Sequence, residues 1–235
     1  IPEYVQDGAA DVGITGIDLI TERGAKVEAL LDLNFGKASL VLAVPQDSDF
    51  QKAQDLEGRK IATEFPEITN QYFKRLGVNV EIIKVSGACE MTPHVGIADA
   101  IVDISSSGTT LMINRLKAID TVFSSTVYLI ANKESLKTKD KILDIKTALE
   151  SVLNAKQRRY LMMNVPESSL KAVKEVLPGM SGPTVMKVES SKLPGESILA
   201  VHAVVDADLI FTIVNKLKKV GARDVLVVPI ERIMP

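Results

Sequence analysis

The residues best suited to chemistry form the segment DISSSGTTL, residues 103–111. An apolar run, ADAIVDI, precedes it and TTLMINRLK follows it, which predicts a strand, a loop and the start of a helix. Such a loop presents unpaired backbone N–H groups and the positive end of the helix dipole. These groups suit the 5-phosphate of a sugar, and the carboxylate of Asp103 suits ribose hydroxyls. The candidate phosphate contacts are Ser105, Ser106, Ser107, Gly108, Thr109 and Thr110.

The alternative for this segment is an ordinary helix N-cap, because Ser and Thr are common at that position without any ligand. The chain has 28 Lys and Arg against 30 Asp and Glu, a formal net charge of −2, so it offers no general attraction to anions. A phosphate site in this chain must therefore rely on local amides and hydroxyls, which this loop supplies.

A second candidate is Glu90, which follows a glycine turn in the stretch SGACEMTP. A carboxylate directed into a sugar site can stabilise the positive charge that develops at an anomeric carbon. An exposed loop carboxylate without a function is the alternative. His94 and His202 lack a surrounding motif, and no Cys/His metal cluster or nucleophile–base pair is present. A Mg²⁺ ion that arrives with a phosphorylated substrate needs only one or two protein oxygens.

Small and hydroxyl residues also end other predicted strands, at Thr15-Gly16, Thr63-Glu64 and Ser86–Ala88. In open α/β sheets, ligands bind at the carboxyl ends of strands, where such loops converge. Ordinary turn chemistry produces the same composition. In the first part of the chain, the substrate-binding candidates are Thr15, Gly16 and Asp18.

The elements that must position these residues alternate between strands and helices. Strands are expected at 10–16, 27–35, 39–45, 58–66 and 78–85, and helices at 17–23 and 66–76. Strands that alternate with helices of about ten residues predict a parallel or mixed sheet with helices on both faces.

The pattern changes after residue 140. Apolar residues spaced by three or four predict a long helix, and residues 160–235 then repeat a strand, a capped helix and a strand. The order β-α-β-β-α-β is the ferredoxin-like arrangement. This part contains no catalytic cluster, which favours a regulatory or structural module. His202 lies in an alternating strand and is expected to be a partly buried structural residue.

Composition excludes several classes of protein. Of the 235 residues, 46% are hydrophobic and 4% aromatic, and Trp is absent, which disfavours base-stacking platforms for single-stranded nucleic acid. The single Cys89 cannot form an internal disulfide, and no apolar run approaches the length of a membrane span. These features predict a cytoplasmic protein. The chain opens on Ile1-Pro2-Glu3 within an expected helix, so we expect an upstream portion to be missing.

Six segments together resemble ATP phosphoribosyltransferase of the long, histidine-regulated form. They are GAADVGITGIDLI, LEGRKIATEFPEIT, SGACEMTPHVGIADAIVDISSSGTTLMINRL, RYLMMNVP, LPGMSGPTV and KKVGARDVLVVPIERIM. They cover essentially the whole chain in order, and the block from Glu90 to Leu111 is the most specific.

The resemblance implies the first step of histidine biosynthesis. ATP would attack phosphoribosyl pyrophosphate through adenine N1, giving phosphoribosyl-ATP and pyrophosphate with Mg²⁺. The implied fold class is α/β, with a two-lobed catalytic part resembling periplasmic binding proteins and a C-terminal ferredoxin-like (ACT-like) domain that binds histidine as a feedback inhibitor. The expected boundaries are 1–44 with 119–154 for the first lobe, 45–118 for the second and 155–235 for the regulatory domain. The implied assembly is a homo-oligomer, a hexamer built from dimers.

The resemblance also implies roles for individual residues. Glu90 and Asp103 match the catalytic carboxylates, and the segment from Asp103 to Leu111 matches the one that holds the ribose and its 5-phosphate. The residues that match the histidine pocket are Met180, Gly182, Thr184, Val204 and Asp224.

Two departures from the family pattern are visible. The family begins with a strand and a Gly-rich basic segment, which this chain lacks. Many relatives also carry an Arg where this sequence reads Lys37-Ala38-Ser39, so the cationic contribution there falls to Lys37 or is absent.

The alternative function is a periplasmic-type small-molecule binding protein without catalysis, since GAADVGITG occurs in that fold too.

Overall fold

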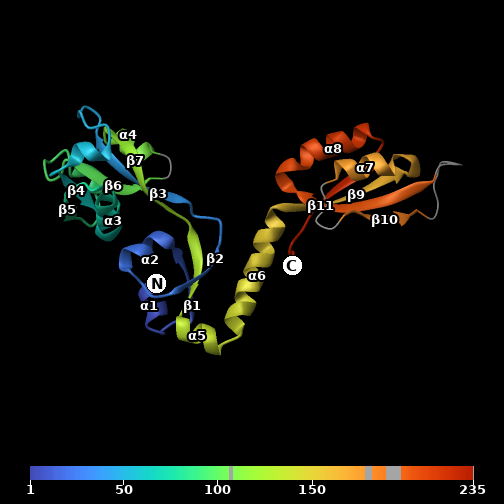
Figure 1. Ribbon diagram of the computed structural model, residues 1–235, viewed down its shortest axis with the longest axis horizontal. Helices are drawn as coiled ribbons and strands as arrows, with labels where there is room; N and C mark the ends of the chain where they lie inside the picture. Colours follow the sequence, from blue (N-terminus) through green and yellow to red (C-terminus); the bar gives the residue numbers. More distant parts are fainter. Residues whose placement is uncertain (106–107, 178–181, 189–196, 235) are drawn as a thin grey trace. The chain divides into compact units, whose positions relative to one another are not determined.

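The computed structural model describes residues 1–105, 108–177, 182–188 and 197–234 (Figure 1). Ser106, Ser107 and Met180, which the sequence nominates as site residues, lie outside the described residues. The chain divides into two units, Ile1–Lys146 and Thr147–Pro235.

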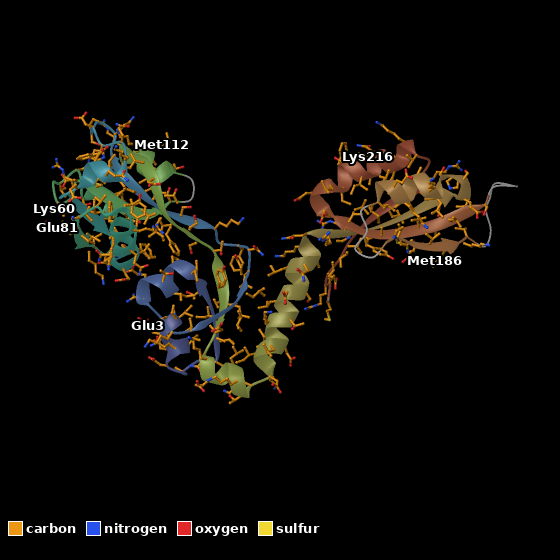
Figure 2. The ribbon with its side chains drawn as sticks, viewed as in Figure 1. Glu3, Lys60, Glu81, Met112, Met186 and Lys216 are labelled. Carbon is orange, nitrogen blue, oxygen red and sulfur yellow. The ribbon has the colours of Figure 1, made fainter. Side chains whose placement is uncertain are left out.

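A five-stranded mixed sheet forms the larger layer of the first unit. Its strands are β3 (Ala38–Pro45), β4 (Lys60–Thr63), β5 (Glu81–Lys84), β6 (Ala100–Ser105) and β7 (Leu116–Ser125), in the order β5-β4-β6-β3-β7. β4 runs parallel to β5 and β6, whereas β3 is antiparallel to β6 and β7. Figure 2 shows Lys60 and Glu81 side by side at the starts of β4 and β5, where they are register partners. The mixed sheet agrees with the predicted alternation of strands and helices.

The core lies on both faces of this sheet. Leu40, Leu42 and Val44 of β3 pack in one apolar cluster with Phe73, whereas Val41 belongs to a second cluster on the other face. Burial on both faces explains why β3 reads as a continuous apolar run rather than an alternating one. The larger cluster includes the buried side of helix α3 (Pro66–Leu76), whose bounds are those that the sequence predicts.

A three-stranded sheet of order β1-β8-β2 forms the other layer of this unit. It consists of β1 (Val12–Gly16), β2 (Glu28–Asp32) and β8 (Val127–Ala131), and all pairs are antiparallel. Helices α1 (Pro2–Gln6) and α2 (Ile17–Arg23) precede and follow β1, and α5 (Lys133–Thr138) follows β8. The predicted helix over 17–23 is confirmed, since Gly24 ends it with a left-handed backbone.

The chain crosses between the two sheets twice, from β2 to β3 and from β7 to β8. Thr126 alone separates β7 from β8, and the N–H groups of Leu33 and Val127 donate to the carbonyls of Val127 and Phe35. Strand pairing places residues 38–45 and 116–125 in the five-stranded sheet. The predicted lobe boundaries, at 44/45 and 118/119, instead assign β3 and most of β7 to the first lobe.

Helix α6 (Lys141–Lys156) carries the chain into the second unit, which contains a four-stranded antiparallel sheet. Its elements are β9 (Arg158–Pro166), α7 (Leu170–Val176), β10 (Thr184–Lys187), β11 (Ile198–Asp206), α8 (Ile210–Lys219) and β12 (Arg223–Pro229). The sheet order β10-β11-β9-β12 is that of a ferredoxin-like domain. The predicted fold class, an α/β part followed by a ferredoxin-like domain, is therefore confirmed.

The two faces of this sheet differ. Leu161, Val201 and Leu217 belong to the apolar core that the sheet forms with α7 and α8, which lie on one face of it (Figure 1). His202 is half-buried, and its Nδ1 lies 3.0 Å from the hydroxyl of Tyr160, as expected for a structural histidine. None of the described helices has both the length and the apolar character that crossing a bilayer requires.

Candidate active site

The loop after β6 is built as a tight turn into a short helix. Gly108 precedes α4 (Thr109–Ile113) and has φ 74°, a left-handed conformation that side chains disfavour. Its N–H donates to the Ser105 hydroxyl at 3.1 Å, which closes the turn. The predicted helix start is confirmed, and the helix ends at Ile113, because Arg115 takes φ 49° and Leu116 begins β7.

Glu90 reaches the same region from the short 3-10 helix Cys89–Met91. The Cys89 thiol donates to the carbonyl of Ala62 on β4 at 3.3 Å, and Glu64, just beyond β4, accepts the N–H of Gly87. Both contacts attach the turn before Glu90 to the end of β4. Since β4 and β6 are parallel neighbours, their carboxyl ends meet at one edge of the sheet. Glu90 and Asp103, which are 13 positions apart in the sequence, are thereby brought to the same edge.

The electrostatics of Asp103 include both neighbouring carboxyls. The pKa of Asp103 is raised, mainly because the side chain is buried, and further by the negative charges of Glu90 and Glu64. The Ile104 N–H, which donates to Asp103 Oδ1 at 2.7 Å, acts in the opposite direction. Sequence reasoning missed Glu64 as a member of this group, although it lies at a strand end that the composition singled out. Only the pairing of β4 with β6 places it there.

Replacing Asp103 with Asn is expected to raise the free energy of unfolding at neutral pH. Because its pKa is raised in the folded state, the native protein binds this proton more tightly than the unfolded chain does. Stability therefore falls as the pH rises through the unfolded pKa and up to the folded one, and it is regained on acidification. The gain from the substitution should vanish below about pH 4, the usual aspartate range.

Urea unfolding at pH 7 and below pH 4 measures this difference. Asp49→Asn is the matched control, because Asp49 is exposed and its substitution should leave stability within about 0.5 kcal/mol. An Asp103→Asn variant that is less stable than the parent at pH 7 would show that the carboxylate stabilises the fold, contrary to this expectation.

The other titratable groups of the site do not form a nucleophile or a resident metal centre. Burial, together with the charges of Asp103, Glu90 and Glu64, raises the pKa of the Cys89 thiol to about 12, so it is protonated at neutral pH. Among the described residues, no group of three or more His, Cys, Asp and Glu side chains is arranged to hold a metal ion.

A polar cavity of about 280 Å³ adjoins the loop after β6. Its lining residues are Lys37, Ala38, Ser39, Ser105, Ser124, Ser125 and Thr126. Ser39 pairs with both Ser105 and Ser124 in the sheet, so hydroxyls from three adjacent strands meet there. One ammonium group surrounded by hydroxyls provides donors suited to an oxyanion.

The structure places the candidates Thr15, Gly16 and Asp18 at the crossing between the sheets. Thr15 is 5% exposed and its buried hydroxyl has no hydrogen-bond partner among the described residues, while Asp18 is 8% exposed. The Ser125 hydroxyl donates to Asp18 Oδ1 at 2.6 Å and accepts the Asp18 N–H at 3.3 Å. A Cβ at Gly16 would clash with Asp18 Oδ1, so any other residue there would displace the carboxylate that Ser125 holds. In this structure Asp18 and Gly16 organise the crossing between the sheets.

The second unit contains a separate cavity of about 440 Å³ on its sheet. The lining residues are Met162, Met163, Asn164, Ala200, His202, Asp224, Val225 and Leu226. Of the predicted histidine-binding residues, Asp224 lines this cavity and accepts a hydrogen bond from the Asn164 amide at 2.9 Å. Thr184 on β10 is the register partner of His202 on β11. Val204 also lies on β11, and Gly182 has a left-handed backbone with φ 90°.

A family model described as HisG, ATP phosphoribosyltransferase, matches residues 1–151, and one described as HisG, C-terminal domain, matches residues 155–232. The chain belongs to the ATP phosphoribosyltransferase family. It is therefore an enzyme, a pentosyltransferase of the first step in histidine biosynthesis, and not a binding protein without catalysis. This assignment confirms the resemblance on which the predicted function rests.

Named relatives agree with this family. The ATP phosphoribosyltransferase of Methanosarcina barkeri is 93% identical over 235 residues, which are 100% of this chain and 81% of that protein. The enzyme of Methanothermobacter thermautotrophicus is 50% identical, again over 81% of its own length. Among solved structures, a chain of the ATP phosphoribosyl transferase (HisG:HisZ) complex from Thermotoga maritima is 30% identical with a TM-score of 0.59, and the similarity covers 66% of this chain and 75% of that chain.

Proposed function

We propose that the chain transfers the phosphoribosyl group of phosphoribosyl pyrophosphate to N1 of ATP and releases pyrophosphate at the carboxyl edge of the five-stranded sheet. The observation that carries this proposal is the meeting of Glu64, Glu90 and Asp103 beside the turn closed by Ser105 and Gly108. A carboxylate beside donors that suit a phosphate can stabilise the positive charge that develops on a phosphorylated sugar.

The 5-phosphate is assigned to the loop from Ser105 to Thr110, which offers neutral donors in a chain without excess positive charge. Asp103 lies at the base of that loop and would accept hydrogen bonds from ribose hydroxyls. Its half-buried position favours such bonds, because they compensate the cost of burying a charged carboxylate.

The chemistry is a displacement at the anomeric carbon. The N1 lone pair of adenine forms the new N–C bond as the bond to pyrophosphate breaks, and pyrophosphate leaves with the electron pair. Positive charge develops on the sugar, and Glu90, held by the turn at residues 86–89, would stabilise it electrostatically. The protein supplies position and charge, without a covalent intermediate.

The leaving pyrophosphate is assigned to the cavity lined by Lys37, Ser39 and Ser124. Lys37 provides a cation there, in the segment where many relatives carry an Arg. Mg²⁺ would neutralise charge on the pyrophosphate, and the oxygens of Glu90 and Asp103 are those that could share it. The proposed cofactor is thus a metal that enters and leaves with the substrate.

Replacing Thr110 with Val tests directly whether the loop from Ser105 to Thr110 binds the 5-phosphate. The substitution preserves shape and removes one hydroxyl donor in the first turn of α4, so the KM for phosphoribosyl pyrophosphate should rise about tenfold, as expected for one lost hydrogen bond to a charged group. The KM for ATP should stay unchanged. Thr121→Val, at an exposed position on β7, is the control. An unchanged KM for phosphoribosyl pyrophosphate would place its phosphate elsewhere.

We also assign histidine, as a feedback inhibitor, to the sheet of the second unit, with Met180, Gly182, Thr184, Val204 and Asp224 as its contacts. The cavity beside Asp224 supports this assignment, since a carboxylate suits the histidine amino group. Asp224→Asn should weaken histidine binding about tenfold, measured by calorimetry on the whole chain, and leave uninhibited turnover unchanged. Binding of equal strength in the variant would exclude Asp224 from the pocket. The family pattern further indicates a cytoplasmic hexamer built from dimers. Light scattering with and without histidine tests this assembly.

A further inference from the structure

A carboxylate on α2 contacts the beginning of α3. Glu22 is half-buried, and its two oxygens accept the N–H groups of Glu67, at 3.2 Å, and Ile68, at 3.0 Å. Glu67 and Ile68 lie 45 and 46 positions after Glu22 in the sequence, so this contact is tertiary rather than local.

The contact meets a need of α3. The helix begins with Pro66, which has no N–H, and Phe65 at the N-cap position makes no side-chain capping bond. The next N–H groups lack partners within the helix. Glu67 is in the first turn, but its carboxylate accepts the Gln71 side-chain amide at 3.0 Å and is engaged along the helix surface. Glu22 therefore provides both the missing acceptors and a negative charge at the positive end of the dipole.

The two helices belong to different sheets. Helix α2 follows β1 of the three-stranded sheet, whereas α3 follows β4 of the five-stranded sheet, and the two helices pack against each other (Figure 1). Asp18, in the first turn of α2, already bonds to Ser125 at the crossing between the sheets. Glu22 lies one turn further along α2, so its contact adds a second attachment outside the crossing strands.

This attachment acts on the site itself. Glu64, which bonds to the turn before Glu90, is only two residues before Pro66, so fixing the start of α3 also fixes the end of β4. Residues 33–37 and Thr126 are the connections between the two sheets, so the contact between α2 and α3 attaches the sheets at a further place.

We propose that Glu22 is a positioning residue, whose carboxylate holds the start of α3 against the three-stranded sheet and keeps the substrate edge of the five-stranded sheet in its working position. Its effect on catalysis rests on the proposed function, whereas its effect on the geometry does not. If the working arrangement becomes less populated, the apparent affinity for substrate falls in proportion. The turnover rate of the bound substrate, kcat, changes little.

Distances between spin labels test the geometry directly. Labels are attached to the whole chain at Lys26→Cys, just after α2, and Lys74→Cys, near the end of α3; both positions are exposed. Cys89 is 2% exposed and its pKa is raised, so it remains unlabelled in the native protein. In this background, Glu22→Ala should broaden the distance distribution and extend it to longer values. Glu22→Gln should give an intermediate result, because its amide oxygen can accept one of the two N–H groups. Glu28→Gln is the control, because Glu28 is an exposed carboxylate on β2 of the three-stranded sheet.

Turnover provides the second measurement. Glu22→Ala should raise the KM for the substrates about tenfold while kcat changes less than about twofold, and Glu22→Gln should recover part of the loss. Distance distributions that are identical in all four proteins would overturn the proposal. An equal loss of kcat in the Ala and Gln variants would also contradict it. Absence of pyrophosphate release from the parent chain would instead count against the proposed function, and the distances would still decide the role of Glu22.

Discussion

Replacing Glu90 with Gln is expected to lower kcat/KM for phosphoribosyl transfer by about 10²–10³-fold, the usual effect of removing one group that stabilises transition-state charge. Gln keeps the size and hydrogen-bonding reach of the side chain and removes its negative charge. That charge lies close to Asp103, at the strand edge where the sugar is assigned. Because positive charge appears on the sugar only as the bond to pyrophosphate breaks, the loss should be in kcat, with KM values close to those of the parent.

Continuous measurement of pyrophosphate release at saturating ATP and phosphoribosyl pyrophosphate separates these parameters. Glu81→Gln is the matched control, since Glu81 is exposed at the start of β5, at the opposite end of the sheet from the site. Its kcat should remain within about twofold of the parent, as for other surface positions without a functional contact. A Glu90→Gln enzyme that retains more than about a tenth of the parental kcat would remove Glu90 from the catalytic role.

Local signals predicted the helices that carry the site. Helix α3 has Pro66 in its first turn and Gly77, with φ 69°, directly after Leu76, and both signals act over one or two residues. The same reasoning defined α2 between Gly16 and Gly24. It offers no signal for the end of α4, because an arginine with a left-handed backbone follows that helix instead of glycine.

Contacts between distant parts of the chain were beyond prediction from the sequence. The composition of β3 and β7 does not reveal which sheet they join, since both sheets offer apolar partners. The place of Asp18 after a Thr-Gly turn predicts a substrate ligand and gives no sign of its bond to Ser125, 107 residues away. Glu64 became part of the site through the pairing of β4 and β6. Strand order and side-chain partners of this kind depend on packing, which no local pattern encodes.

The second large effect concerns stability. Phe73→Ala is expected to lower the free energy of unfolding of residues 1–146 by about 3–5 kcal/mol. Phe73 is 1% exposed, packs edge-on against Tyr72 with ring centroids 5.1 Å apart, and lies in the cluster beneath α3 with Leu42. The sheet and helix around it are fixed by their own hydrogen bonds, so they cannot collapse into the vacated space, and the cavity adds to the lost burial of the ring.

Leu217→Ala is the matched variant in the other unit. Leu217 is fully buried on α8, in a cluster that shares no residue with that of Phe73, and its truncation should cost about 2–5 kcal/mol. Hydrogen exchange measured on peptides from each unit distinguishes the two losses. Phe73→Ala should reduce protection in β3, β4 and α3 and leave β9 and β11 unchanged, whereas Leu217→Ala should do the reverse. Equal loss of protection in both units from either substitution would mean that the two cores unfold as one, despite their separate packing.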